Sequence, residues 1–103
     1  MLVQMIFPNK FKVANQTINV RIEPHDKDNR YGYWNDVTCE IVLFENIEIE
    51  GNLIKLNEEQ ICNTFYHELI HCFQFFFNNN YDEAQAQSFA NFIREYQCTQ
   101  SKQ

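Results

Sequence analysis

Hydrophobic and polar residues alternate along much of the first half of the chain. Residues 10–23 keep this alternation on both sides of the polar pair Asn15-Gln16. A period of two positions is typical of strands that bury one face, and a short polar break between two such runs is typical of a hairpin. We therefore expect a β-hairpin here. The polar segment 24–29 should end it, with His25 as a solvated loop histidine.

Further strand-like segments lie between this loop and residue 57. Residues 31–34 are short and aromatic, and residues 37–44 form the most apolar run, which predicts a strand covered on both faces. Residues 47–49 alternate, and we expect residues 53–56 to pair back with them across a turn at Glu50-Gly51-Asn52. The first half should therefore be mostly antiparallel sheet.

The apolar spacing changes to three and four positions after Asn57, which predicts an amphipathic helix. Asn57 is a favoured N-cap, and Gln60 stands where a capping box places its second member. The expected buried stripe of this helix consists of Ile61, Phe65, Leu69, Cys72, Phe73 and Phe76. Asparagines 78–80 should end the helix, because asparagine tolerates the left-handed cap conformation.

A second helix is expected to begin around residues 81–83 and to run through Tyr96, with residues 99–103 as a frayed tail. The whole chain, residues 1–103, is then one α+β domain. A small antiparallel sheet in the N-terminal half packs on two C-terminal helices.

Composition narrows the classes of function. The 103 residues are 45% hydrophobic and 16% aromatic, which suits one ordered domain with a modest core. A net charge of −6 without a basic stripe argues against a nucleic-acid or anionic membrane partner. No apolar run is long enough to span a bilayer, and the first residues lack the features of a signal peptide. We therefore expect a cytoplasmic protein whose four cysteines are free thiols.

Candidate chemistry centres on His67-Glu68-Leu69-Ile70-His71. Two imidazoles four residues apart lie on one face of a helix, so both can reach a single metal ion. Glu68, between them, is placed to take a proton from a water held by that ion. This H-E-x-x-H arrangement is that of zinc-dependent hydrolases. The plainer interpretation is a pair of surface histidines without a metal.

A catalytic zinc site takes three protein ligands and keeps a further position for water. The asparagine turn should fold the second helix back against the first, so that a residue near its start can approach both histidines. Glu83 is the preferred third ligand, and Asp82 is its rival, although Asp82 can instead cap the helix. Glu83 can also be a helix-start glutamate favoured only by the dipole. Gln87, one turn further on, is a candidate to orient a ligand by a hydrogen bond.

The histidine motif, followed by residues 83–90 (E-A-Q-A-Q-S-F-A), resembles the gluzincin metallopeptidases. In particular it is similar to the small ImmA/IrrE-like zincins, whose second motif reads like E-A-x-A-N-x-F-A. The resemblance implies that Glu83 is the third zinc ligand and that Glu68 is the catalytic base. This chain departs from the pattern at Gln85 and Gln87, and its two motifs are closely spaced.

The implied function is zinc-dependent hydrolysis of peptide bonds by a metal-activated water, with a peptide or protein as the partner. We expect an extended peptide to add to a sheet edge in the region of residues 42–49, and Tyr81 or Tyr96 to stabilise the oxyanion. One alternative is a catalytically silent zincin-like domain that binds a protein partner. Another is a structural metal site completed by Cys62, Cys72 or Cys98.

Overall fold

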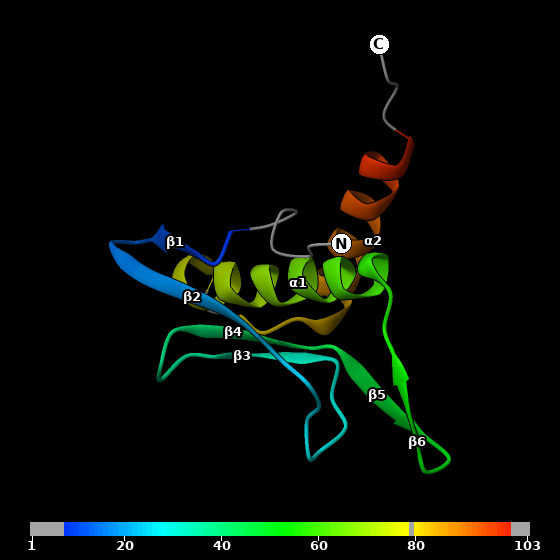
Figure 1. The fold of residues 1–103 in the computed structure, drawn as a ribbon. Coiled ribbons are helices and arrows are strands. Elements are labelled where there is room, and N and C mark those ends of the chain that lie inside the picture. The colour runs from blue at the N-terminus through cyan, green and yellow to red at the C-terminus, as the bar shows by residue number, and fades with distance from the viewer. Residues whose placement is uncertain (1–7, 79, 100–103) are drawn as a thin grey trace.

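The computed structural model describes residues 8–78 and 80–99 and shows an α+β architecture, as predicted (Figure 1). The described part forms six strands before the first helix: β1 (Lys10–Val13), β2 (Gln16–Glu23), β3 (Gly32–Asn35), β4 (Glu40–Phe44), β5 (Asn46–Ile49) and β6 (Asn52–Lys55). Its helical segments are α1 (Glu58–Phe73), a π-helical turn η2 (Gln74–Asn78), and α2 (Glu83–Thr99). Of the expected frayed tail, residues 100–103 lie outside the described residues.

The main sheet has the strand order β1-β2-β4-β3 and is mixed: β1-β2 and β4-β3 are antiparallel, as expected, whereas the β2-β4 pairing is parallel and corrects the expected antiparallel sheet. β2 and β4 run parallel, with Val20 opposite Ile41, whereas β4 and β3 run antiparallel, with Tyr33 opposite Val42. The reason is that β3 and β4 form a hairpin in which β3 lies at the edge of the sheet. β4 then lies between β3 and β2 and runs parallel to β2. The most apolar strand thereby gains a neighbour on each side, and the stretch Ile41–Phe44 is buried on both faces.

The two expected hairpins are confirmed, and both turn through left-handed backbone conformations. Ala14 and Asn15 have φ values of 49° and 65°, and Glu50 and Gly51 have values of 52° and 83°. Two successive positive φ angles match the twist of the flanking strands in two-residue hairpins. β5 and β6 pair only with each other among the described strands, and their hairpin projects away from the main sheet (Figure 1).

The strand expected to begin at Val37 begins at Glu40 instead. Val37 is 87% exposed and lies in a turn that precedes β4. In this turn Asn35 Oδ1 accepts hydrogen bonds from the backbone N–H groups of Val37 and Thr38 at 2.9 and 3.2 Å. Cys39 has a φ of 56°. Asparagine before a turn competes with strand pairing through such local hydrogen bonds, and apolar composition alone does not reveal this.

α1 packs across one face of the main sheet and closes the core. Ile18, Ile41 and Leu43 of the sheet are fully buried against residues of α1 such as Ile61 and Phe65. The predicted capping box is present, because Asn57 and Gln60 each accept a hydrogen bond from the other's backbone N–H group at 2.8 Å.

Of the predicted buried stripe, Ile61, Phe65 and Cys72 are buried, Leu69 and Phe76 are partly buried against the core, and Phe73 is 46% exposed. Phe73 follows Cys72 by one position, about 100° around the helix, and therefore lies at the edge of the stripe. The next residue, Gln74, is buried instead, with 1% of its surface exposed.

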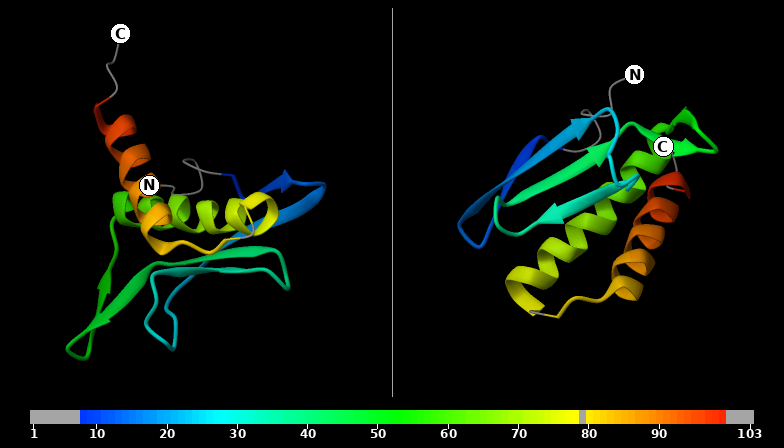
Figure 2. Two further views of the ribbon diagram at one scale, coloured as in Figure 1. Left: turned by 180° about the vertical axis from the view of Figure 1, so that it is seen from behind. Right: turned by 90° about the horizontal axis from the view of Figure 1, so that it is seen from below.

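α2 lies alongside α1, and its C-terminal half rises away from the sheet (Figures 1 and 2). Ala86 and Ala90 are fully buried on α2, and their small side chains let the two helices approach closely. No helix in the described part of the chain is both long and apolar enough to cross a membrane.

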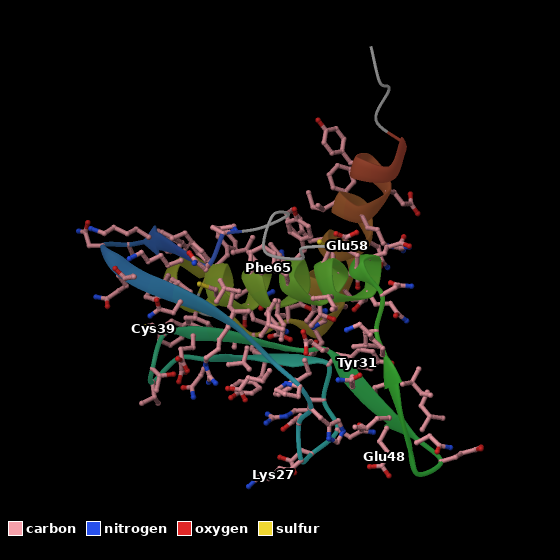
Figure 3. The ribbon with its side chains drawn as sticks, in the orientation of Figure 1. Lys27, Tyr31, Cys39, Glu48, Glu58 and Phe65 are labelled. Carbon is pink, nitrogen blue, oxygen red and sulfur yellow. The ribbon has the colours of Figure 1, made fainter. Side chains whose placement is uncertain are left out.

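The loop after β2 is held by a buried carboxylate. Lys27 projects from this loop away from α1 (Figure 3), whereas its neighbour Asp26 is only 6% exposed. Asp26 Oδ2 accepts hydrogen bonds from Arg30 Nε at 2.6 Å and from the backbone N–H of Arg30 at 3.1 Å. These bonds hold the pKa of the Asp26 carboxyl below its usual value, against the opposing effect of burial.

Asp26→Asn should lower the free energy of unfolding at pH 7 by about 1–2 kcal/mol. This is the low end of the range for a hydrogen bond to a charged group, because the side chain of Arg30 is half exposed and solvent weakens the interaction. A carboxyl whose pKa is lower in the folded state stabilises the fold above its unfolded pKa, and this contribution is lost as the pH falls through the folded pKa. The difference between the variant and the native chain should therefore shrink in acid. Urea titrations at pH 7 and pH 3 measure it. Asp28→Asn is the control: its carboxylate is also near Arg30, but it is exposed and lies 3.8 Å from Arg30 Nη2, so its loss should cost less. An equal loss in both variants would contradict the assignment.

Candidate metal centre

The structure brings His67, His71 and Glu83 together. The two histidines lie one turn apart on α1, and Glu83 is the first residue of α2. Glu83 Oε1 lies 2.8 Å from His67 Nε2 and 3.3 Å from His71 Nε2, and the two Nε2 atoms are 3.2 Å apart. Among the residues that the structure describes, these three form the only group of histidine, cysteine and carboxylate side chains with the spacing of a metal site.

The buried amide of Gln74 joins the end of α1 to the start of α2 and so brings Glu83 to the histidines. Its Nε2 donates to the Asp82 carbonyl at 3.1 Å and to Gln85 Oε1 at 2.6 Å. Its Oε1 accepts from the backbone N–H of Asp82 at 3.2 Å. Gln74 is the first residue of η2, the π-helical turn through which the chain leaves α1 and passes toward α2. Such turns are frequent at functional sites.

Asp82, the rival third ligand, caps α2 instead. Its Oδ1 accepts a hydrogen bond from the backbone N–H of Gln85 at 3.0 Å, three residues on, which is the geometry of an N-cap. The carboxylate that reaches the histidines is therefore that of Glu83, one residue later.

Two glutamines determine which nitrogen of each imidazole carries the hydrogen. Gln87 Nε2 donates to Asn91 Oδ1, so Gln87 Oε1 faces His67 Nδ1 at 3.0 Å. Gln74 Oε1 faces His71 Nδ1 at 2.9 Å. In both neutral imidazoles Nδ1 is then the donor, and Nε2 is left with its lone pair toward Glu83. Gln87 occupies the role expected from the sequence, whereas Gln74 was missed. The available signal was its position three residues after His71, on the same helical face.

Two imidazole nitrogens and a carboxylate oxygen therefore converge, all within 2.8–3.3 Å of one another. Their mutual repulsion is offset by a proton on an imidazole, which then donates to Glu83, or by a metal ion among the three atoms. A tetrahedral zinc ion with bonds of about 2.0–2.1 Å needs its ligand atoms roughly 3.3 Å apart. The donor set thus suits zinc in chemistry, and two of the three separations are close to this spacing.

Glu68 is 9% exposed and lies beside this group. Burial raises the pKa of its carboxyl above the usual value, and the charges that His67 and His71 carry when protonated oppose the rise. Glu68, His71 and Glu83 line one cavity of about 510 Å³, whose opposite wall is β3. A carboxyl group in this environment can accept a proton from a water held in the cavity.

Tyr81 orients Glu83. Its ring stacks on that of His71, with centroids 4.2 Å apart, and its hydroxyl donates to Glu83 Oε2 at 2.5 Å. This hydrogen bond is the main cause of the lowered pKa of Glu83, while burial and the same bond raise the pKa of Tyr81 to about 12. Of the two tyrosines expected to stabilise an oxyanion, Tyr81 thus hydrogen-bonds to the Glu83 carboxylate, and Tyr96 does not line this cavity.

Two of the three cysteines considered as ligands belong to the hydrophobic core. Cys62 and Cys72 are free thiols, and burial raises their pKa values to about 11 and about 12. Neither thiol belongs to the group of described side chains whose spacing suits a metal ion. The side chain of Cys98 lies outside the described residues.

The expected substrate edge at residues 42–49 is wrong for the main sheet, because β4 lies between β2 and β3. Among the described strands, the one that borders the candidate metal centre and has an unpaired edge is β3.

Comparison of the chain with protein-family models, curated proteins and solved structures found no match.

Replacing the glutamine that faces each histidine should weaken zinc binding. Gln87→Leu and Gln74→Leu each remove the acceptor from an Nδ1–H group, and loss of such a partner typically costs 10–100-fold in metal affinity. Isothermal titration with Zn²⁺ measures the change, and thermal melting reports whether the buried Gln74 variant remains folded. Ser88→Ala, next to Gln87 on α2, is the control and should bind zinc as the native chain does. Unchanged affinity in Gln87→Leu would contradict its orienting role.

Proposed function

We propose that this chain is a zinc-dependent metallopeptidase, a minimal zincin-like domain with His67, His71 and Glu83 as metal ligands and Glu68 as general base. The observation that carries the proposal is the convergence of two imidazole nitrogens and a carboxylate oxygen next to a buried carboxyl group. When bound, zinc supplies Lewis acidity and lowers the pKa of a water that it holds toward about 7. Glu68 accepts a proton from water and passes it to the leaving amine.

The unpaired edge of β3 supports a peptide as the substrate. The Tyr31 carbonyl accepts a hydrogen bond from the backbone N–H of Phe44 on β4, and antiparallel pairing alternates from residue to residue. The backbone groups of Gly32 and Trp34 therefore point away from β4, toward the open edge. An extended peptide can pair with these groups while its scissile bond lies near Glu68.

Close packing at Gly32 supports this arrangement. A Cβ atom at this position would lie 2.7 Å from Thr64 Cγ2 on α1. Glycine thus lets β3 approach the helix that carries the histidines.

The alternative function is a catalytically silent domain that binds a protein partner. It is favoured by the exposed aromatic side chains Phe73, Phe75 and Phe77 at the end of α1, because exposed aromatic groups are common in protein interfaces. The retained Glu68 favours the peptidase. For either function we propose a cytoplasmic setting, where Cys39, Cys62 and Cys72 would remain the free thiols they are in the structure.

Glu68→Gln should bind zinc as tightly as the native chain and lose about 10²–10⁴-fold in turnover, because the amide cannot accept the proton. Zinc titration and peptide hydrolysis monitored by mass spectrometry measure the two properties. Glu58→Gln, in the exposed first turn of α1, is the control and should retain both. Hydrolysis that survives in Glu68→Gln would remove the assigned role of this residue.

Glu83→Ala should lose zinc affinity by more than about 100-fold, because it removes a ligand rather than a group that orients one. Asp82→Asn keeps an N-cap residue and should bind zinc normally. The same titration measures both variants. The reverse result, with affinity lost in Asp82→Asn and kept in Glu83→Ala, would make Asp82 the third ligand.

A further inference from the structure

The candidate metal centre lies in the middle of a continuous cleft. The cavity that holds Glu68, His71 and Glu83 shares Tyr31, Gly32 and Glu68 with a neighbouring cavity of about 630 Å³. It shares Trp34, His71 and Tyr81, among others, with a cavity of about 660 Å³ on its other side.

The cleft follows α1 from Gln60 to Gln74, roughly 20 Å at 1.5 Å per residue. An extended peptide of about six residues has this length. Tyr31, which lies below the N-terminal part of α1 in Figure 3, lines the first half of the cleft.

One end of the cleft, which we call the amide pocket, is lined by polar uncharged side chains: Asn63, Thr64, Gln87 and Asn91. Arg94 and Glu59 at its wall pair with each other, with Arg94 Nη1 3.3 Å from Glu59 Oε2, and the remaining carboxyl group is that of Glu68 beside the candidate metal centre. Away from Glu68, the pocket therefore offers hydrogen-bonding groups without a free charge. It suits an uncharged polar side chain, because a charged one would lose its hydration with no opposite charge to replace it.

The other end, which we call the aromatic pocket, has four rings in its wall, those of Tyr33, Trp34, Phe75 and Tyr81, together with polar groups that include the carboxylate of Asp36. The rings of Trp34 and Phe75 have centroids 6.1 Å apart. Arg30 is the cation of this pocket, and it is neutralised by Asp26 and stacks over Tyr33 at 4.4 Å from the ring centroid. A large apolar or aromatic side chain is the ligand that such a wall accommodates.

Buried hydrogen-bond donors without a partner coincide with this cleft. In the described part of the chain they are Trp34 Nε1, Asn63 Nδ2 and Arg94 Nε, and all three belong to residues of its walls. Buried donors are normally satisfied, and no acceptor of the described residues lies within hydrogen-bond reach of these three. Peptide carbonyl and carboxamide oxygens are acceptors of the kind that such N–H groups bind.

We propose that the cleft selects peptides with a large aromatic or apolar side chain on one side of the scissile bond and an uncharged polar side chain on the other. The aromatic pocket holds the first side chain and the amide pocket holds the second. This inference rests on the proposed function for the position of the scissile bond, although the two pockets can also select peptides for binding alone.

The test uses the zinc-loaded Glu68→Gln protein, which should bind peptides without cleaving them, and fluorescence anisotropy as the readout. The probes are labelled hexapeptides with Phe and Gln at the two central positions, in both orders, since the direction of the bound chain is to be determined. One order should bind at least about tenfold more tightly than the peptide with two central alanines. Replacing its Gln by Glu or Lys should abolish this gain.

Variants of the pockets assign each preference. Phe75→Ser should remove most of the gain due to Phe, whereas Phe77→Ser, which removes an exposed ring that does not line the pocket, should change nothing. Asn91→Leu should shift the preference at the second position from Gln to Leu. Equal affinity for the Phe/Gln and the Ala/Ala peptides, or equal effects of Phe75→Ser and Phe77→Ser, would overturn the inference.

Hydrolysis by the zinc-loaded native chain separates this inference from the proposed function. Cleavage without preference at the two positions would overturn the selectivity and leave the peptidase in place. Selective binding without any cleavage by the native chain would overturn the peptidase and leave the two pockets as those of a peptide-binding domain.

Discussion

The side chain of Gln74 makes the contact on which the rest of the site depends. It is buried at the junction of α1 and η2. It hydrogen-bonds to His71, to Asp82 just before α2 and to Gln85 in the first turn of α2. A buried amide that lost any of these partners would leave unpaired polar atoms in the interior, so the arrangement is strongly favoured as a whole. The start of α2 is thereby held at the face of α1 that carries both imidazoles.

This arrangement keeps three nitrogen and oxygen atoms close together. Gln74 and Gln87 each contact an Nδ1 atom, so that both Nε2 atoms face inward, and Tyr81 holds the second oxygen of Glu83 so that the first faces the imidazoles. The three side chains are thus held in place by contacts within the protein. A group oriented in this way loses less conformational freedom when it binds, so these contacts would favour the metal binding that we propose.

The sheet contributes the opposite wall of the site. Because β4 is covered on both sides, the edge that borders the metal centre is β3, and close packing at Gly32 brings that edge to α1. The result is a cleft with a protein backbone along one wall and a helix along the other. Its two ends differ in polarity, since one is formed by α2 and the first turns of α1 and the other by the aromatic residues near η2.

Local patterns in the sequence determined the elements and half of the site. The hairpins, the capping box at Asn57 and the helical spacing of His67 and His71 all follow from interactions between residues a few positions apart, which periodicity and turn chemistry report directly. The sequence favoured Glu83 over Asp82 but left both open, and only the tertiary structure decided that Glu83 reaches the histidines. It alone decided that Gln74 joins the two helices and that β4 lies beside β2. These outcomes depend on contacts between segments far apart in the chain, which are selected by the packing of the whole core rather than by local patterns.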